Sequence, residues 1–383
     1  MAQPEHIPFT VSSRAENELA YLEQVLQSRN LSGDGPFTMR CHAWLRRHHN
    51  TSGALLTCSG TAALELSCVL ADLQPGDEVI MPSFTFSSTA NAVVLRGAKP
   101  VFVDVDPKTM NLDPARLSEA LSPRTRAILP IHYAGVVADM DPIMAFAAAH
   151  DLMVMEDAAQ SLGSSYKGVP AGMIGDCAAI SFHETKNIVC GEGGAFVTRR
   201  ADLMERAEII REKGTNRSQF NAGLVDKYSW VDIGSSLLPS EIQAAVLMAQ
   251  FEQITEFTSR RMKVWARYHE AFASLEASGH LQRLHPPEHS EHNAHLYAVI
   301  LSKRYDRAAV LAALHGRGVH AVFHYVPLHS APAGKKFGRV GGPMPVTDRA
   351  GASLIRLPLF ADLTDDQVER VIESLSDILQ TAE

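Results

Sequence analysis

The chain of 383 residues has little of what marks secreted, membrane-spanning or nucleic-acid-binding proteins. Its five cysteines show no paired or CxxC spacing, which is typical of thiols that stay reduced in a cytoplasm. No uninterrupted apolar run approaches the ~20 residues of a membrane helix. The first six residues contain no basic or apolar stretch, so we expect no secretory signal. A net charge of -8 argues against nucleic acid as the main partner. We therefore expect a cytoplasmic protein.

Histidine is more abundant, and His42, His48 and His49 lie near Cys41. Their spacing matches none of the standard zinc patterns, so the sequence predicts no metal site. The remaining composition, with 46% hydrophobic and 20% charged residues, is that of an ordinary globular protein. A chain of this length can form two or three domains with sizeable cores.

Between about residues 52 and 200, short apolar runs alternate with helical patterns. Near-continuous apolar strands separated by helices are typical of an α/β fold with a mostly parallel sheet that is buried on both faces. Turn sequences such as Gln74-Pro75-Gly76-Asp77 separate the runs. The seven predicted strands lie at residues 54–57, 78–81, 100–104, 127–131, 153–155, 178–182 and 195–198.

The second half of the chain has a different pattern. From residue 239 to about residue 278, apolar residues recur at roughly 3.6-residue spacing, which predicts a long linking helix. A smaller α+β pattern follows, and Thr364 with Gln367 forms a capping box before its last helix. The expected elements of this part are strands at 295–301 and 319–323 and helices at 307–316 and 365–382.

These patterns predict two domains. We expect an N-terminal segment and large domain over residues 1–250, and a linking helix with a small C-terminal α+β domain over residues 251–383. Within the small domain, the glycine-rich basic stretch at 335–345 predicts a mobile loop.

The most informative segment is Ser181-Phe182-His183-Glu184-Thr185-Lys186-Asn187, which precedes a glycine-rich turn. Another apolar run, upstream of it, ends at Asp157. Pyridoxal phosphate needs such a pair, because a lysine amine bonds to its aldehyde carbon and an acid keeps its pyridine nitrogen protonated. Taken alone, a loop lysine is usually a solvated charge, and an aspartate after a strand is often a helix cap. The hypothesis of amino-group transfer therefore depends on further segments that fit the same cofactor.

A candidate phosphate site follows the first predicted strand. There Ser59-Gly60-Thr61 opens a helix rich in Ala and Leu. Free N–H groups and the positive end of the dipole at a helix N-terminus suit a phosphate, with Gly60 and Thr61 as contacts. A plain N-cap explains these residues equally well. Ser181, five residues before Lys186, can donate its hydroxyl to the phosphate or merely satisfy nearby backbone.

Three more residues are candidates from their positions. Phe86 follows the second strand and can stack on the pyridine ring, although a core phenylalanine fits the spacing as well. Gln160, three residues after Asp157, can reach the phenolic oxygen of the ring or merely satisfy nearby backbone. His329 ends the run His324-Tyr325-Val326-Pro327-Leu328-His329, on a loop that can close over the cofactor site or form a solvated surface turn.

In this order, these segments resemble the StrS/DegT-type nucleotide-sugar aminotransferases over nearly the whole chain, from Leu31 to Phe360. Within that family the chain is most similar to the branch that aminates C4 of dTDP-4-keto-6-deoxy-D-glucose. The resemblance implies a fold-type-I pyridoxal-phosphate-dependent transferase, with a mostly parallel seven-stranded sheet in the large domain. The segments that carry the similarity to this branch are 181–187, 211–220, 226–228, 232–236 and 323–329.

The resemblance also implies the reaction partners. They are pyridoxal 5'-phosphate as cofactor, L-glutamate as amino donor, a dTDP-keto sugar as acceptor, and a homodimer whose active sites are shared between subunits. The family's usual Gly-x-Asn-x-Arg motif reads Gly234-Ser235-Ser236-Leu237-Leu238 here. Ser236 therefore stands where the family's asparagine reaches the cofactor phosphate of the other subunit, and its reach is shorter.

The resemblance assigns a role to each candidate residue. Lys186 is the catalytic base, Asp157 binds the ring nitrogen and His329 belongs to the loop of the sugar pocket. The remaining assignments are Gly60, Thr61 and Ser181 on the phosphate, Phe86 on the ring face and Gln160 near the phenolic oxygen.

Three alternative functions are left open by the residues alone. Related dehydratases have histidine at the lysine position, and Lys186 argues against that chemistry. Transamination at C3, or on another keto sugar or a cyclitol, is excluded only by the similarity to one branch. A non-catalytic scaffold that binds pyridoxal phosphate is disfavoured by the presence of both Lys186 and Asp157.

Overall fold

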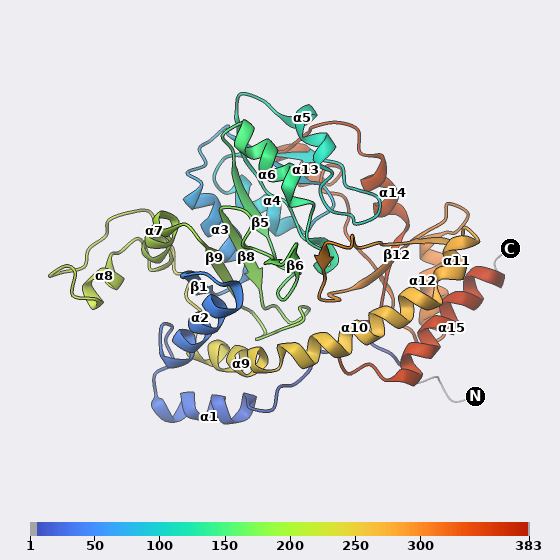
Figure 1. Cartoon of the computed structure of the whole chain (residues 1–383), viewed down its shortest axis with the longest axis horizontal. Helices are drawn as coiled ribbons and strands as arrows, with labels where there is room; N and C mark the ends of the chain where they lie inside the picture. The colour runs from blue at the N-terminus through green and yellow to red at the C-terminus, as the bar shows by residue number, and fades with distance from the viewer. Residues whose placement is uncertain (1–5, 382–383) are drawn as a thin grey trace.

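The protein has a large part and a small part, which one long helix connects (Figure 1). The structure is a computed structural model and describes residues 6–381. The large part is built on an eight-stranded sheet of order β1-β9-β8-β5-β4-β2-β3-β14. In this sheet β9 is antiparallel to both its neighbours, and all other pairs are parallel. The strands are β1 (Gly53–Thr57), β2 (Glu78–Pro82), β3 (Lys99–Val103), β4 (Thr125–Ile128), β5 (Met153–Asp157), β8 (Cys177–Ser181), β9 (Gly194–Thr198) and β14 (Arg339–Val340).

The seven predicted strands are all present, and the sheet has one strand more than predicted. The extra strand, β14, comes from the stretch 335–345, for which the prediction of a mobile loop was wrong: α13 (Pro332–Phe337) and β14 form there. Arg339 donates to the buried Glu78 carboxylate at 2.9 and 2.6 Å. Hydrogen bonding from Arg339 lowers the pKa of Glu78 to about 2. This ion pair attaches the C-terminal segment to the edge of the large sheet.

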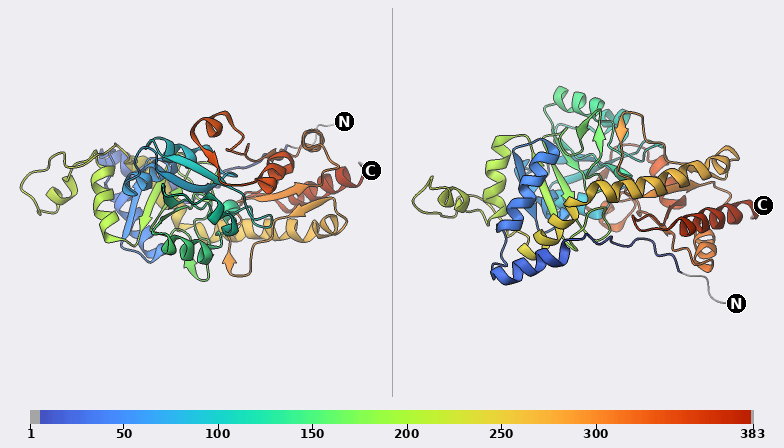
Figure 2. Two further views of the ribbon diagram at one scale, coloured as in Figure 1. Left: turned by 90° about the horizontal axis from the view of Figure 1, so that it is seen from above. Right: turned by 60° about the horizontal axis from the view of Figure 1, so that its bottom comes forward.

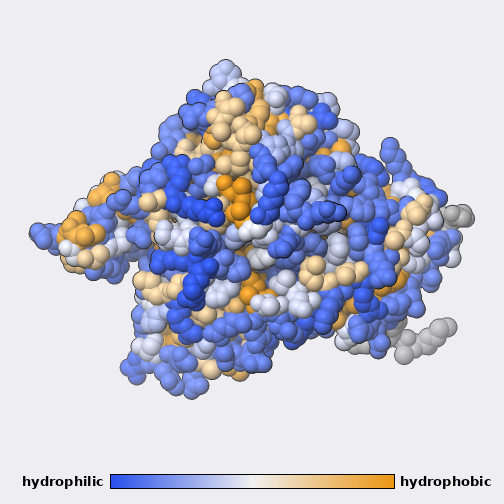
Figure 3. All heavy atoms as spheres, in the orientation of Figure 1, coloured by the Kyte–Doolittle hydropathy of each residue, from blue (hydrophilic) through white to orange (hydrophobic). Residues whose placement is uncertain are grey.

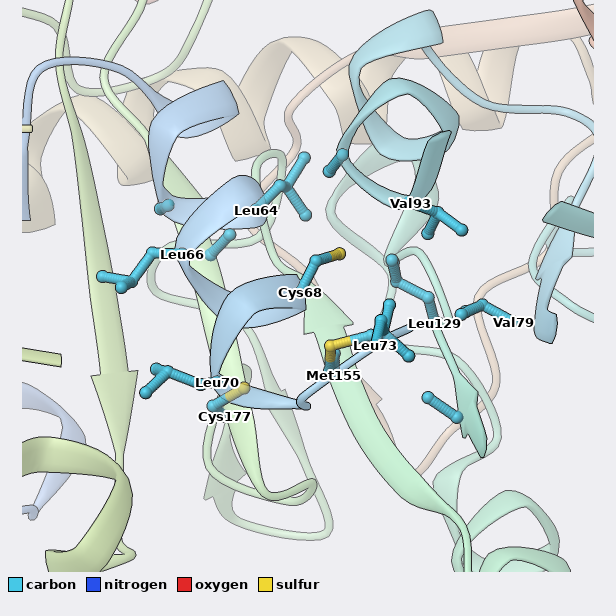
Figure 4. Close-up of a cluster of buried hydrophobic side chains, with 14 of the residues drawn as sticks. Leu64, Leu66, Cys68, Leu70, Leu73, Val79, Val93, Leu129, Met155 and Cys177 are labelled. Carbon is cyan, nitrogen blue, oxygen red and sulfur yellow. The ribbon is translucent and has the colours of Figure 1, made fainter. Parts of the chain in front are cut away.

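Helices cover both faces of the large sheet. Side chains at successive strand positions point to opposite faces, and near-continuous apolar strands therefore have two faces to bury. One face packs on α3 (Gly60–Leu70), α4 (Ser87–Val94) and α7 (Ala201–Arg211) through the cluster of Figure 4, which includes Leu64, Val93 and Met155. The opposite face packs on α2 (Pro36–His49), α5 (Leu117–Ala120), α6 (Met140–Ala149) and α9 (Glu241–Glu252). Since Met155 faces α3 and α4, Asp157 shares that face and Glu156 faces the other one.

The small part has its own antiparallel sheet of order β10-β12-β15-β13. The predicted helix at 307–316 and the capping box are confirmed: Gln367 N–H donates to Thr364 Oγ1, and Thr364 N–H donates to Gln367 Oε1. The predicted strand at 319–323 is shorter, since residue 319 forms only an isolated bridge, with Ile7. The elements are β10 (Leu281–Arg283), β12 (Tyr297–Leu301), α12 (Arg307–Gly316), β13 (Val322–Phe323), α14 (Pro345–Ser353), β15 (Leu354–Leu357) and α15 (Asp365–Thr381).

The predicted linking helix is divided into α9, α10 (Ile254–Ala271) and α11 (Ala273–Ala277). Helix α10 connects the two parts, as both views of Figure 2 show. Phe257, near its start, packs in the large core, whereas Val264 and Tyr268 pack in the small core. The sheet of β6 (Ser165–Tyr166), β7 (Val169–Pro170) and β11 (Ser290–Glu291) adds a second connection. The division at residue 250 stays a prediction.

Residues 212–240, between α7 and α9, form a projecting arm that includes α8 (Arg217–Asn221). It extends away from the body of the molecule at the left of Figures 1 and 3, where its tip shows hydrophobic residues. Trp230 is 80% exposed and Leu224 is 74% exposed. Large apolar side chains at such exposure are typical of a surface that another molecule covers.

Candidate active site

The candidate site lies at one edge of the large sheet. The strands β1, β8, β5, β4, β2 and β3 all end at this edge, because each is parallel to the others and only β9 runs in the opposite direction. Ligands of open α/β sheets bind at this carboxyl edge. Its polar residues include Ser59 after β1, Ser83 after β2, Asp104 after β3, Asp157 at the end of β5 and Ser181 at the end of β8.

Asp157 is buried, with only 5% of its surface exposed. Its Oδ2 accepts a hydrogen bond from the Thr89 hydroxyl of α4 at 2.8 Å, and its Oδ1 accepts one from the N–H of Ala159 at 3.1 Å. A carboxylate has about four lone-pair sites, so Asp157 keeps acceptor capacity for a further donor. A protonated ring nitrogen is such a donor.

Lys186 lies in the tight turn after β8, where its N–H donates to the carbonyl of His183 at 2.8 Å. It lines a small cavity together with Gln160, Ser181 and His295. Burial lowers the pKa of Lys186 to about 8, the negative charge of Asp157 opposes this, and the positive charge of Arg356 adds to it. A lysine with this pKa is neutral often enough near pH 7 to act as a nucleophile or base.

The predicted phosphate contacts come together where α3 and α4 begin. Ser59 is the N-cap of α3 and accepts from Ala62 N–H at 3.0 Å, as the plain N-cap alternative requires. The Thr61 hydroxyl lies 2.8 Å from the Ser88 hydroxyl, in the first turn of α4. A Cβ added at Gly60 would lie 2.7 Å from Ser181 Cβ, so only glycine allows this approach. Two helix N-termini and these hydroxyls fit a phosphate group.

Phe86 is the N-cap residue of α4 and is 60% exposed. Its exposure excludes the alternative that it is a core side chain. The core position is taken by Phe84, two residues earlier, which is fully buried. An exposed aromatic ring at the carboxyl edge of β2 is free to stack on a planar ligand.

Gln160 is buried and already has two partners. Its Oε1 accepts from Ala134 N–H at 2.7 Å, and its Nε2 donates to the Tyr325 hydroxyl at 2.9 Å. An amide nitrogen has two N–H groups, so one is left for the cavity that Gln160 lines. Its predicted contact with the phenolic oxygen stays a prediction.

His329 and Ser236 lie outside the residues that line this cavity. The His329 ring is 2.7 Å from the Ser83 hydroxyl through Nδ1 and 3.2 Å from Asp348 through Nε2. These contacts attach its loop to the end of β2. Ser236 is exposed near the base of the arm, where it forms a bridge with Glu212. The catalytic and cross-subunit roles predicted for these two residues stay predictions.

Several residues of the site were not identified from the sequence. His295 donates from Nδ1 to Asn187 Oδ1 at 3.0 Å, and Asn187 donates to the carbonyl of Asn293, so these three form a wall of the cavity. Burial, with the charges of Lys186, Arg261 and Arg356, lowers the pKa of His295 well below its usual value. His295 comes from the small part of the chain, so no spacing pattern relates it to Lys186. For Arg356 the sequence did contain a signal, because an arginine lies within the otherwise apolar strand β15.

The sequence predicted no metal site at the histidine cluster near Cys41. In this cluster His42 Nε2 accepts from Leu56 N–H at 2.9 Å, and His49 Nδ1 lies 3.1 Å from the carbonyl of Leu45. Across residues 6–381, no group of three or more His, Cys, Asp or Glu side chains is arranged to hold a metal ion. In the same residues, no helix is long and apolar enough to cross a membrane.

Comparison with known proteins gives matches over nearly the full length. GDP-perosamine synthase of Caulobacter vibrioides is 33% identical over 367 residues, which is 95% of each chain. The solved aminotransferase TlmJ from Streptoalloteichus hindustanus has a TM-score of 0.90 and 30% identity, covering 99% of this chain and 100% of TlmJ. NtdA from Bacillus subtilis, solved with bound cofactor PMP, has a TM-score of 0.86 and 28% identity, covering 95% and 82%.

The cofactor follows from the family and from the residues present. The buried Asp157, the perturbed Lys186 and the glycine at position 60 fit pyridoxal phosphate at the carboxyl edge of the sheet. The profile of the DegT/DnrJ/EryC1/StrS aminotransferase family matches residues 12–376. The chain therefore belongs to this family and is a pyridoxal-phosphate-dependent sugar aminotransferase.

Proposed function

We propose that the protein transfers the amino group of L-glutamate to C4 of dTDP-4-keto-6-deoxy-D-glucose. The observation that carries amino transfer is the pair of Lys186 and Asp157, whose charges interact at the same sheet edge. The choice of sugar and position is supported by the branch similarity of segments 181–187, 211–220 and 323–329. The product would be a dTDP-4-amino-4,6-dideoxyhexose.

Each side chain has a distinct part in this proposal. When bound, pyridoxal phosphate supplies an aldehyde carbon and a cationic ring that draws electrons from the reacting carbon. Asp157 holds a proton on the ring nitrogen, and Lys186 carries a proton to and from the reacting carbon. The phosphate would be held by Gly60, Thr61 and Ser181, with Phe86 on the face of the ring and Gln160 at its phenolic oxygen.

The proposal includes a homodimer. Its support is the projecting arm, which exposes Leu224 and Trp230, and the exposed position of Ser236 near the arm's base. A second copy would cover these apolar side chains, and Ser236 would reach the cofactor phosphate of that copy. Sedimentation at micromolar concentration should give twice the chain mass. A monomer with full activity would contradict this part of the proposal.

One of the relatives suggests a second candidate for the sugar that accepts the amino group. One relative that is 33% identical is named GDP-perosamine synthase, so a GDP-linked keto sugar is the alternative to a dTDP-linked one. Incubation with L-glutamate and either the dTDP- or the GDP-linked 4-keto-6-deoxy sugar separates the two. NMR of the product identifies the aminated carbon and whether the amine is axial or equatorial. Amination at C3, or preference for the GDP sugar, would contradict the proposal.

A further inference from the structure

Asn293 joins two loops of the candidate site. It lies in the segment between β11 and β12, and only 1% of its surface is exposed. Its Nδ2 donates to the carbonyls of Gln160 and Leu162, each at 2.9 Å. Its own carbonyl accepts from Asn187 Nδ2 at 2.8 Å. One buried residue of this connecting segment therefore binds both the loop after β5 and the turn after β8.

The Asn293 amide has a fixed orientation. Two carbonyl oxygens face its Nδ2, so the reversed amide would place oxygen against oxygen. Within residues 6–381 its Oδ1 has no hydrogen-bond partner, and it lies against the backbone of Gly135, where an added Cβ would be 1.9 Å away. A buried oxygen without a partner costs stability. What the amide contributes here is therefore its pair of donated hydrogen bonds.

The segment that carries Asn293 is itself held by the linking helix. Arg261 of α10 is buried and donates to the carbonyls of Ala294 at 3.0 Å and His295 at 2.6 Å. Hydrogen bonds from a charged group are stronger than those between neutral groups. His295 Nδ1 in turn donates to Asn187 Oδ1 at 3.0 Å. The segment is thus fixed to α10 on one side and to the turn after β8 on the other.

Strand pairing alone does not fix the distance between Asp157 and Lys186. Asp157 ends β5, where its backbone is in register with residue 179 of β8. Lys186 lies five residues beyond the end of β8, in a turn. The ring of pyridoxal phosphate is rigid, and its nitrogen and its aldehyde-bearing carbon lie on opposite sides. An acid at the nitrogen and an amine at the aldehyde must therefore be held at a constant separation.

We propose that Asn293 is a positioning residue, which holds the Lys186 turn at the distance from Asp157 that the cofactor spans. This inference rests on the roles that the proposed function gives to Lys186 and Asp157. Asn293 binds the backbone of one loop and the side chain of Asn187 in the other, so it acts through the position of both loops. A displacement of about 1 Å is enough to impair such a geometry.

The test measures the dissociation constant of pyridoxal phosphate for the purified chain by equilibrium dialysis. In Asn293→Ala this constant should rise by about tenfold, because two hydrogen bonds that fix the loop are lost. In a Lys186→Ala background the same substitution should change it by less than about twofold, since the cofactor then has no amine to reach. The comparison separates an effect that passes through Lys186 from a general effect on the cavity.

Asn187→Ala supplies a second variant. It removes the other side of the connection without changing Asn293, so the result does not depend on one variant folding. Its loss of cofactor affinity should also require Lys186. When Asn187→Ala and Asn293→Ala are combined, the loss should be no greater than the larger single loss, as expected for residues that act as a unit.

Gln250→Ala is the matched control. Gln250 is 1% exposed, and its Nε2 donates to the carbonyl of Ser13 and to the carboxylate of Glu18. Among residues 6–381 its Oε1 has no hydrogen-bond partner, as for the amide oxygen of Asn293. Gln250→Ala should therefore lower the melting temperature about as much as Asn293→Ala, while the dissociation constant of the cofactor stays unchanged.

The opposing outcomes are distinct. Equal losses with and without Lys186 would mean that Asn293 shapes the cavity without acting on Lys186, and would overturn the inference. An unchanged dissociation constant in Asn293→Ala, or an equal loss in Gln250→Ala, would overturn this inference alone. If Lys186→Ala by itself binds the cofactor as tightly as the wild type, the role of Lys186 in the proposed function fails together with this inference.

Discussion

The two faces of β5 carry neighbouring acids with opposite surroundings. Glu156 is fully buried, and its carboxylate accepts from His132 at 2.7 Å and from the N–H groups of Gly172, Ile174 and Gly175 at 2.6 to 2.8 Å. On the other face, Asp157 accepts from one hydroxyl and one N–H. Both acids are buried, but only Glu156 has all its acceptor sites used.

This difference separates a structural acid from a reactive one. Burial would raise the pKa of Glu156, but hydrogen bonds from His132 and from backbone N–H groups outweigh it and lower the pKa. Glu156 therefore holds the 172–175 turn in place. Asp157 has free acceptor capacity and a charge that acts on Lys186, which is what a bound cation or ring nitrogen requires. Saturation of the lone pairs, more than burial, distinguishes the two roles.

The largest effect should come from the Asp157 face. Lys186→Ala should abolish steady-state transamination, because no other group at this edge can replace its amine as nucleophile and base. Its melting temperature should stay near that of the wild type, since a buried amine is removed without breaking a network. Turnover of product by a folded Lys186→Ala enzyme would remove this residue from the mechanism.

Asp157→Asn should lower kcat by ~10²–10⁴-fold, which corresponds to a few kcal/mol of barrier. The amide cannot hold a proton on the ring nitrogen, so electron withdrawal weakens. Cofactor content, measured by absorbance after gel filtration, should remain close to that of the wild type. A near-normal kcat would mean that the functional acid lies elsewhere and that the contrast between the two faces is wrong.

Glu156→Gln should have the reverse profile. The amide places an NH₂ group against hydrogen-bond donors, which should cost about 3 kcal/mol or more of stability. Thermal unfolding should begin several degrees lower, while kcat per folded enzyme below that temperature stays within a few-fold of the wild type. A loss of activity as large as that of Asp157→Asn, with unchanged stability, would contradict a structural role.

His329 is a further test of the contrast between structural and reactive residues. Both of its ring nitrogens have partners, as expected for a structural residue. If its loop nevertheless belongs to the sugar pocket, His329→Ala should slow the keto-sugar half-reaction by about tenfold. The glutamate half-reaction should change by less than twofold. Stopped-flow absorbance follows each half separately, and equal damage to both would group His329 with Glu156.

The smallest expected effect is on the pH dependence of cofactor capture. Capture of pyridoxal phosphate by cofactor-free enzyme requires neutral Lys186, so its rate should rise with pH through a midpoint of about 8. The charge of Asp157 raises the pKa of Lys186, so Asp157→Asn should move this midpoint to lower pH. Arg356→Gln removes an opposing positive charge and should move it to higher pH. Glu156→Gln should leave it unchanged, and any other ordering would contradict the electrostatic description.

Much of the large domain could be predicted from the sequence by itself. Its strands are apolar runs of four or five residues between turns, and burial on both faces makes such runs visible without tertiary information. Lys186, Asp157 and Gly60 could be found for a related reason. Asp157 ends such a strand, whereas Gly60 follows β1 by three residues and Lys186 follows β8 by five. Parallel strands bring their carboxyl ends to one edge.

Only the tertiary structure decided which side chains complete the site. Arg356, His295 and Tyr325 come from the small part of the chain, more than 100 residues after Lys186, and no periodicity connects them to it. The same holds for β14, whose two residues carry no strand pattern and join the sheet through the ion pair of Arg339 with Glu78. Local patterns report which residues are buried, whereas contacts between distant segments depend on how the two sheets pack against each other.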